Sequence, residues 1–220
     1  MHRSDDRIVF AAYGVDIDVE VTHECSEKCA YPSLFSGVDG MLPPGAAART
    51  TARDAPHAIR VTCRGTTLAV TCSEEVTQSF GDLALALHAV DQAIRSTIAV
   101  HAPGLVFIHA GAVAVDGQVI VLPGTSMAGK TTLVAELVRA GAGYLSDEYA
   151  VLDADGLVHP FARRLSVREP TGRREVPVAE LGGTTVTGPL PVGLVAAITF
   201  ESGADWQVGP GDQGSCARAL

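Results

Sequence analysis

The sequence is poor in basic residues and nearly devoid of lysine. Its 220 residues carry 16 lysine and arginine side chains against 25 acidic ones, a formal net charge of −9. Lys28 and Lys130 are its two lysines. Because an acidic chain without a basic run repels polyanions, we expect neither nucleic acid nor an anionic membrane as a partner.

Long hydrophobic runs are missing as well. Every apolar stretch is interrupted by glycine, aspartate or histidine well short of the ~18 residues that indicate a membrane span. The start, Met1–Arg7, has no basic segment followed by an apolar one, so it does not predict a signal peptide. We therefore expect a cytoplasmic protein whose five cysteines are reduced.

Apolar material is nonetheless plentiful. Hydrophobic residues make up 47% of the chain and charged residues 19%, which excludes a disordered protein and allows a sizeable core. The length fits one domain with an appendage or two small domains. After residue 103 the pattern of the sequence changes to short, almost wholly apolar segments, so we expect an α+β unit at 1–103 and a second domain at 104–220.

The first unit has simple periodic patterns. Val15–Val21 alternates apolar and polar residues, which predicts a strand. Apolar residues recur at helical spacing between 83 and 94, which predicts a helix. Between them, 32–57 is rich in proline, glycine, alanine and arginine and predicts a long excursion.

The cysteines divide into two groups. Cys63 and Cys72 lie in two alternating runs that predict a hairpin, in register with apolar neighbours, so both thiols are predicted to be buried. His23, Cys25 and Cys29 belong either to a metal site or to an ordinary surface loop. A structural zinc site needs a fourth ligand, and the sequence assigns none.

The second domain begins with short, almost wholly apolar strands. They are predicted at 105–109, 112–115 and 118–122. Asp116-Gly117 stands between the last two, and this pair favours the positive φ angles of a two-residue turn. A β-hairpin is therefore predicted here.

A helix and further strands follow. Apolar residues on one side predict a helix at 130–140, with Gly141 placed to end it. A short strand ends at the carboxylates Asp147 and Glu148. Residues 215–220 resemble the first turn of a helix, which is compatible with an incomplete carboxyl end. The remaining predicted strands are 150–152 and 157–159, which turn at Asp155-Gly156, and a buried strand at 194–200.

The loop between the predicted strand 118–122 and the helix at 130–140 matches G-x-x-x-x-G-K-[ST]. In such a loop the glycines let backbone N–H groups converge on phosphate oxygens, and the helix adds the positive end of its dipole. Lys130 reaches the β- and γ-phosphates, and Thr131 offers a hydroxyl to Mg²⁺. The residues predicted to bind nucleotide are Gly124, Thr125, Ser126, Met127, Ala128, Gly129, Lys130, Thr131 and Thr132.

Missing motifs and the distance between the loop and the next carboxylates disfavour some classes of phosphate-loop protein. A guanine-specific GTPase needs Asn/Thr-Lys-x-Asp, but Lys28 is followed by Cys29-Ala30, so a GTPase is disfavoured. ABC-type and motor ATPases reach their acidic strand only after a long insertion. Here Asp147 follows Lys130 by 17 positions, on the strand next after the loop helix. The carboxylates are thus predicted to lie beside the phosphate pocket.

Three segments together resemble the kinase domain of HPr kinase/phosphorylase, whose phosphate-loop fold is shared with phosphoenolpyruvate carboxykinase. They are 108–113, 124–131 and 145–148. His109 precedes Lys130 by 21 positions, and this spacing is similar to that of the family. The resemblance implies an α/β P-loop kinase domain with a mixed sheet, here preceded by a small α+β unit.

The resemblance also implies roles for individual residues. Asp147 would take the proton from the attacking hydroxyl, Glu148 with Thr131 would hold the metal together with Asp147, and His109 would lie near the γ-phosphate. The family pairs two aspartates, whereas this chain has Asp147-Glu148. By analogy, Arg168 would bring positive charge to the transferring phosphoryl group, more so than its neighbours Arg163 and Arg164.

Each of these residues also has an interpretation without chemistry. His109 would be a core histidine at a strand end, Asp147 and Glu148 a solvated turn, and Arg168 a surface cation. The family segment associated with phosphorylase activity has no match here; the nearest stretch is 165–170. Phosphorylase activity and HPr as a substrate are therefore not supported.

We accordingly expect an ATP- and Mg²⁺-dependent kinase that transfers the γ-phosphate to a serine-type hydroxyl. The acceptor is a protein, a precursor peptide or a small metabolite, and unit 1–103 is expected to help bind it. The alternative is an ATP-binding regulatory module without turnover. The sequence leaves a homo-oligomer open.

Overall fold

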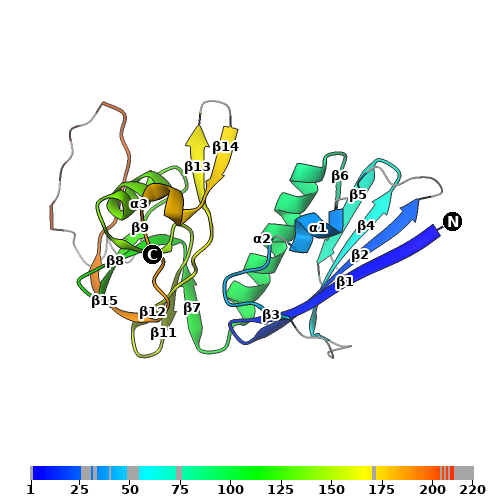
Figure 1. Cartoon of the computed structure of the whole chain (residues 1–220), viewed down its shortest axis with the longest axis horizontal. Coiled ribbons are helices and arrows are strands. Elements are labelled where there is room, and N and C mark those ends of the chain that lie inside the picture. The colour runs from blue at the N-terminus through cyan, green and yellow to red at the C-terminus, as the bar shows by residue number, and fades with distance from the viewer. Residues whose placement is uncertain are drawn as a thin grey trace. The chain divides into compact units, whose positions relative to one another are not determined.

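The structure is a computed structural model of mixed α/β class, with many strands and few helices. It describes residues 2–25, 31, 34–39, 41–48, 55–72, 76–169, 172–203, 205, 207 and 209–210. The chain divides into two compact units, Met1–Pro103 and Gly104–Leu220, each with its own main sheet (Figure 1). This division falls at the boundary between residues 103 and 104 where the sequence pattern changes.

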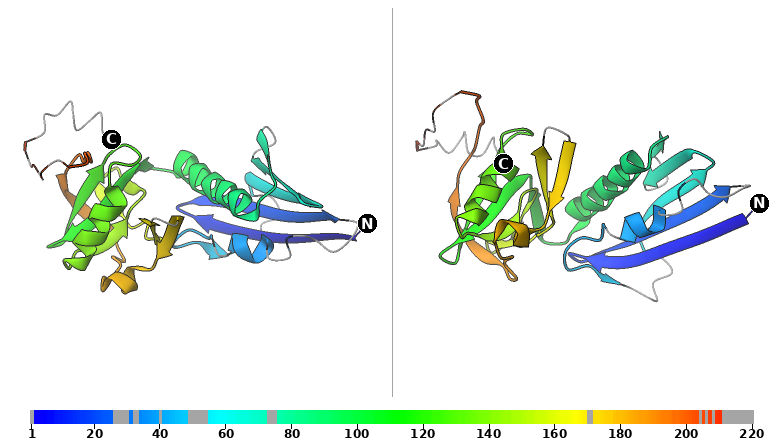
Figure 2. Two further views of the ribbon diagram at one scale, coloured as in Figure 1. Left: turned by 90° about the horizontal axis from the view of Figure 1, so that it is seen from above. Right: turned by 45° about the horizontal axis from the view of Figure 1, so that its top comes forward.

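The first unit is built on one six-stranded sheet (Figure 2). Its strands are β1 (His2–Ala12), β2 (Val15–Cys25), β3 (Ala47–Ala48), β4 (His57–Arg64), β5 (Thr67–Cys72) and β6 (Val76–Phe80). They lie in the order β3-β1-β2-β4-β5-β6. All neighbours are antiparallel except β2 and β4. The strand predicted at Val15–Val21 and the β4–β5 hairpin are confirmed.

Helix α2 (Leu83–His101) covers one face of this sheet, and the short helix α1 (Leu34–Asp39) packs against α2. Asp82 caps α2, since its carboxylate accepts a hydrogen bond of 3.0 Å from the N–H of Leu85. The helix predicted at 83–94 is confirmed and continues to His101. Its buried side, which faces the sheet, is formed by Ala86, Val90, Ile94 and Ile98.

By length and composition alone, α2 is also the one described helix that is long and apolar enough to cross a membrane, with a mean hydropathy of 1.2. The helix carries charge, however: Arg95 is 9% exposed and pairs with Asp91 at 3.0 Å. Its contacts with β2, β4, β5 and β6 already account for its apolar side.

The cysteine predictions have mixed outcomes. Cys63 is buried, as predicted. Cys72 is only half-buried, so the prediction of a second buried thiol is wrong. The reason is that alternation fixes the face of a strand but not how far its cover extends, and Cys72 is the last residue of β5. Cys29 and the side chain of Cys25 lie outside the described residues.

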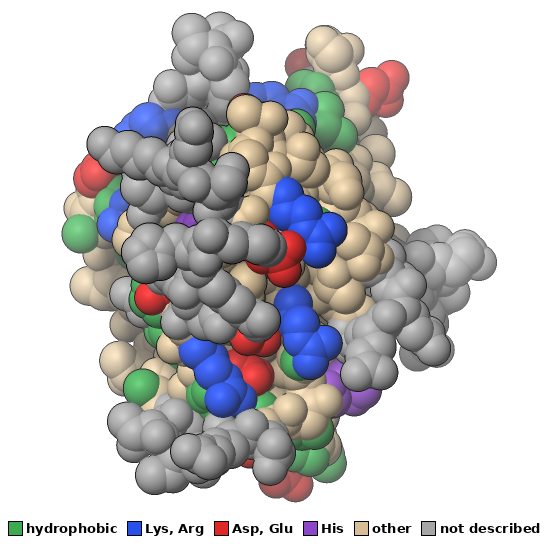
Figure 3. Space-filling model, turned by 90° about the vertical axis from the view of Figure 1, so that its right-hand side faces the viewer, with side chains coloured by type: hydrophobic (Ala, Val, Ile, Leu, Met, Phe, Trp, Pro, Cys, Tyr) green, Lys and Arg blue, Asp and Glu red, His purple; other side chains and the backbone are tan. Residues whose placement is uncertain are grey.

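The face of the sheet opposite α2 is charged. The odd-numbered residues Ile17, Val19 and Val21 of β2 are buried, so the even-numbered residues of this strand point the other way. Figure 3 shows basic and acidic side chains interspersed on one side of the molecule. Exposed pairs of this kind each contribute about 0–1 kcal/mol. The pairs are Arg7–Asp18 at 2.7 Å, Arg60–Glu20 at 3.6 Å and Arg64–Glu24 at 2.8 Å.

Two histidines stack in this unit. The rings of His57 on β4 and His101 at the end of α2 have centroids 4.1 Å apart. Burial, and secondarily the charge of His101, hold the pKa of His57 below its ordinary value of 6.5. Stability from this pair is therefore complete above the ordinary pKa and is lost as the pH falls below it, because the unfolded chain then binds the proton more readily.

We predict that the wild-type chain loses stability between about pH 7 and pH 5 and that His57→Asn reduces this loss. Urea denaturation at a series of pH values measures the effect. His88→Asn, at an exposed position of α2, is the matched control and should leave the pH dependence unchanged. Equal pH profiles for wild type and His57→Asn would contradict the prediction.

The second unit contains a seven-stranded sheet. Its strands are β7 (Leu105–Ile108), β8 (Ala110–Val115), β9 (Gln118–Pro123), β10 (Gly143–Ser146), β11 (Ala150–Asp153), β12 (Leu157–His159) and β15 (Leu190–Val195). The order is β10-β8-β9-β15-β12-β11-β7. Only β9 and β15 pair in parallel. The predicted hairpins are confirmed, and Asp116 and Gly117 have φ angles of 50° and 77°.

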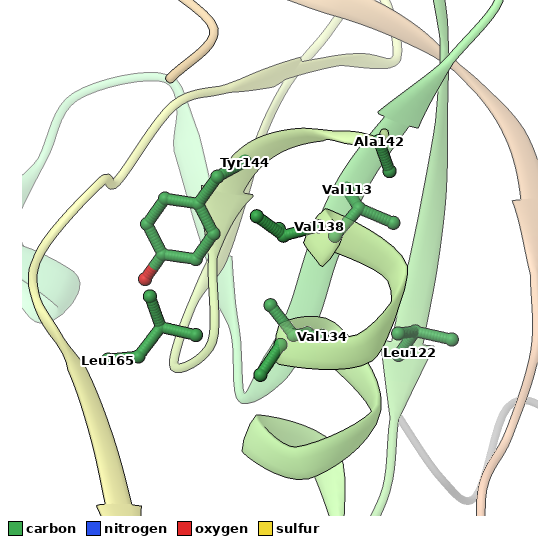
Figure 4. Close-up of a cluster of buried hydrophobic side chains, with 8 residues drawn as sticks. Val113, Leu122, Val134, Val138, Ala142, Tyr144 and Leu165 are labelled. Atoms are coloured by element: carbon green, nitrogen blue, oxygen red, sulfur yellow. The ribbon is translucent and has the colours of Figure 1, made fainter. Parts of the chain in front are cut away.

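Helix α3 (Lys130–Arg139) packs on β8 and β10. The two-stranded sheet of β13 (Leu165–Glu169) and β14 (Gly172–Val176) and the 3₁₀ helix η1 (Val178–Leu181) complete this side. As predicted, Gly141 stands just past the end of the helix; its φ angle is 104°, and its N–H donates to Val138 O at 3.0 Å. Figure 4 shows the core beneath α3. Its buried members are Val113, Leu122, Val134, Ala135, Val138, Ala142, Tyr144 and Leu165.

One predicted strand is wrong. The buried strand expected at 194–200 is instead β15, which ends at Val195, and Leu194 is 52% exposed. Beyond β15 the chain still follows β9, since the N–H groups of Ala196 and Ile198 bond Val121 O and Pro123 O at 2.9 and 3.0 Å. An apolar run predicts extended chain, but it does not reveal which neighbours cover it. The predicted helical turn at 215–220 lies outside the described residues.

Gly111 on β8 sets how closely α3 approaches the sheet. A Cβ at this position would lie 2.7 Å from Cγ2 of Val134. We predict that Gly111→Ala destabilises the protein by about 1–3 kcal/mol, because the core of the second unit is overpacked. Gly188→Ala is the control, since a Cβ there meets nothing within 4 Å. Denaturation midpoints check both variants, and an unchanged midpoint for Gly111→Ala would contradict the close approach.

Candidate functional site

Three strands of the second unit point the same way. β9 and β15 are parallel, and β10 also runs with β9 because both are antiparallel to β8, which lies between them. Their carboxyl ends therefore meet at one edge of the sheet, the usual place for ligands in an α/β sheet. The residues that follow β10 and β9 at this edge are Asp147-Glu148 and the loop 124–129, and His109 precedes β8 there.

The loop joins β9 to α3 through an unusual backbone. Met127 and Gly129 have φ angles of 76° and 86°, and Gly129 is the N-cap of α3 without a side-chain hydrogen bond to the helix amides. The N-cap therefore gives the first amides of α3 no side-chain acceptor, an arrangement that suits an anion. Along the loop Thr125, Ser126 and Met127 are exposed. Thr132, in the first turn of α3, is exposed as well.

Lys130 folds back over this loop. Its side chain is 7% exposed, and Nζ donates hydrogen bonds to Gly124 O at 2.7 Å and Thr125 O at 3.0 Å. Burial lowers the pKa of Lys130, and the charge of Asp147 acts in the opposite direction. Neutral carbonyls thus hold the ammonium at the loop, and its positive charge lies where it is partly shielded from water.

Asp147 accepts hydrogen bonds from three elements. Thr131 Oγ1 on α3 donates to Oδ2 at 3.0 Å, and Tyr144 Oη on β10 donates to Oδ1 at 3.0 Å. The N–H of Ser166 on β13 lies 3.4 Å from Oδ2. The carboxylate is therefore fixed against the start of the loop helix, as the spacing in the sequence predicts.

Tyr144 is a site residue that the sequence analysis missed. Its side chain is fully buried under α3, and burial, together with the charge and hydrogen bond of Asp147, raises the pKa of its phenol. The charge of Arg163 acts on the phenol in the opposite direction. Its apolar neighbours in the strand gave it the pattern of a core residue, and only its position three residues before Asp147 could have marked it.

Glu148 and His109 lie together beside this carboxylate. Ser146 Oγ accepts the N–H groups of Glu148 and Tyr149 at 3.0 and 2.9 Å, which shapes the turn after β10. The N–H of Ala110 donates to Glu148 O at 3.1 Å. The exposed ring of His109 meets the ring of Tyr149 edge-on, with centroids 6.2 Å apart. His109 is thus at the site edge and not in the core.

Arg168, the arginine predicted to act on the phosphoryl group, makes no hydrogen bond or ion pair with the other site residues in the described part of the chain. Arg168 is exposed on β13, where its cross-strand neighbour is Arg173, and within the described part of the chain it makes no ion pair. Arg163 is the arginine whose charge acts on the phenol of Tyr144. The structure therefore joins the loop, Lys130, Thr131 and Asp147 by hydrogen bonds, places His109 and Glu148 beside them and leaves Arg168 apart.

No family model matches the chain, and no curated protein matches it either.

We predict that Tyr144→Phe costs about 1.5–3 kcal/mol of stability, because Asp147 loses a buried donor while the ring still fills the core. Tyr149→Phe is the control, since the hydroxyl of Tyr149 has no hydrogen-bond partner among the described residues. Chemical denaturation at neutral pH measures both. Equal losses in the two variants would contradict a special role for the Tyr144 hydroxyl.

Proposed function

We propose that this chain is an ATP- and Mg²⁺-dependent kinase with a phosphate-loop fold similar to that of HPr kinase. The observation that carries the proposal is the hydrogen bond between Thr131, at the start of the loop helix, and Asp147, at the end of β10. It joins a phosphate-binding loop to a carboxylate at one sheet edge. Phosphoryl transfer asks a protein mainly for such positioning and for charge neutralisation.

The chain's own groups suit a triphosphate. Loop amides and the first turn of α3 bind phosphate oxygens, and Lys130 exchanges the carbonyls of Gly124 and Thr125 for a phosphate. A lysine that is already held at the loop loses little entropy when it makes this exchange.

The oxygen donors at Thr131 and Asp147 fit Mg²⁺, which is usually bound by one or two protein oxygens and by substrate phosphates. When bound, the ion neutralises charge that develops on the phosphates. Because Thr131 contacts Asp147, we assign both to the metal and exchange the two carboxylate roles expected from the family resemblance. Glu148 then accepts the proton of the acceptor hydroxyl, and His109 lies near the transferred phosphoryl group.

The acceptor in this proposal is a serine-type hydroxyl of a protein, a precursor peptide or a metabolite, and the unit 1–103 helps to bind it. Purified chain incubated with γ-labelled ATP, Mg²⁺ and a peptide array tests transfer. Transfer of label to a peptide by the wild-type chain, together with loss of this transfer in Glu148→Gln, supports the kinase. ATP binding without transfer or hydrolysis for any acceptor supports the alternative, a regulatory module that binds nucleotide without turnover.

We predict that Asp147→Asn raises the Mg²⁺ concentration needed for ATP binding, because it weakens the oxygen pair with Thr131, whereas Glu148→Gln leaves that requirement unchanged and lowers transfer. Lys130→Ala lowers both ATP affinity and turnover, because the lost charge contact costs several kcal/mol of phosphate binding and transition-state stabilisation combined. Calorimetric titrations with ATP at a series of Mg²⁺ concentrations measure these effects. Full ATP affinity and turnover in Lys130→Ala would refute the assignment of the loop.

A further inference from the structure

The chain after β15 runs along the phosphate loop. Ala196 and Ile198 continue the hydrogen bonding to β9 up to its last residue, Pro123. A Cβ on Gly124 would lie 2.9 Å from Ile198 O, and a Cβ on Gly129 would lie 3.8 Å from Cβ of Phe200. The segment 196–200 therefore touches both ends of the loop, and Phe200 stands beside the N-cap of α3.

Phe200 is exposed at this place. Its side chain is 68% exposed, and Met127 at the tip of the loop is 66% exposed. The other large hydrophobic side chains that are exposed in the described part of this unit, Val106, Val115 and Leu194, lie on strands. Phe200 is the one aromatic ring among them, and its flat face is suited to stacking.

The topology separates the two ends of a bound nucleotide. In the order β10-β8-β9-β15, Asp147 follows β10 and Phe200 follows β15, so they lie on opposite sides of the loop that follows β9. The terminal phosphate belongs on the side of Thr131, Asp147 and His109, where the reacting groups are. The nucleoside must then leave the loop toward the carboxyl end of β15.

We propose that Phe200 is the platform on which the purine base of the nucleotide stacks. This inference rests on the proposed function, because it needs a nucleoside triphosphate on the loop. Stacking on an aromatic ring is tolerant of base identity, since every base has a π-face. The platform therefore supplies affinity for a nucleoside and little discrimination between adenine and guanine.

Calorimetric titration of the full chain with ATP and with inorganic tripolyphosphate, both with Mg²⁺, tests the platform. Phe200→Ala should raise the Kd for ATP by about 5- to 150-fold, the fold-change that corresponds to the loss of one base–aromatic stack. The Kd for tripolyphosphate, which has no base, should stay within about twofold. Phe200→Trp should keep the affinity for ATP, and Val106→Ala is the control for loss of exposed apolar surface.

Two results would overturn the platform alone. Unchanged ATP affinity in Phe200→Ala would show that the base lies elsewhere, and an equal loss for ATP and tripolyphosphate would show that Phe200 only supports the loop. In both cases the proposed function would still stand if the wild-type chain binds tripolyphosphate and Lys130→Ala does not. A wild-type chain that binds neither ligand would refute both proposals.

Discussion

The hydrogen bond from Thr131 to Asp147 is the interaction around which the second unit is organised. It connects the first turn of α3 to the residue after β10, two elements joined by only one short turn. Close packing of α3 on β8 accompanies this bond, since a Cβ on Gly111 of β8 would lie 2.7 Å from Cγ2 of Val134 on α3. The same helix thus carries a polar contact at the sheet edge and a tight contact in the apolar core.

The side chains of Asp147, Ser146 and Lys130 at this edge have their hydrogen-bond partners within the protein. Asp147 has donors from α3, β10 and β13, Ser146 accepts two turn amides, and Lys130 is bonded to loop carbonyls. A buried polar group without such partners would cost about 1–3 kcal/mol. The network therefore fixes its members before any ligand arrives, and pre-organised groups are those that stabilise charge in a transition state at little further cost.

Sequence patterns predicted the parts of this site that depend on neighbours along the chain. The loop, the Asp116-Gly117 turn and the helix end at Gly141 follow from local backbone requirements, so their residue types are diagnostic. Tyr144 and Phe200 could not be found this way. Tyr144 has the pattern of a core residue, and Phe200 was assigned to a buried strand, because the partners that decide their environment come from other elements.

The same distinction separates the functions within the proposed kinase. Phosphate recognition uses backbone amides, which any sequence with the right glycines supplies, whereas the reacting end and the nucleoside end depend on side chains from different strands. Three strands point the same way, and in the proposed kinase these two ends would lie on opposite sides of one loop. In the proposed kinase a hydroxyl acceptor would therefore approach from the side of β8 and β10, where His109 is exposed and Glu148 lies next to it. The acceptor and the base then never compete for the same surface.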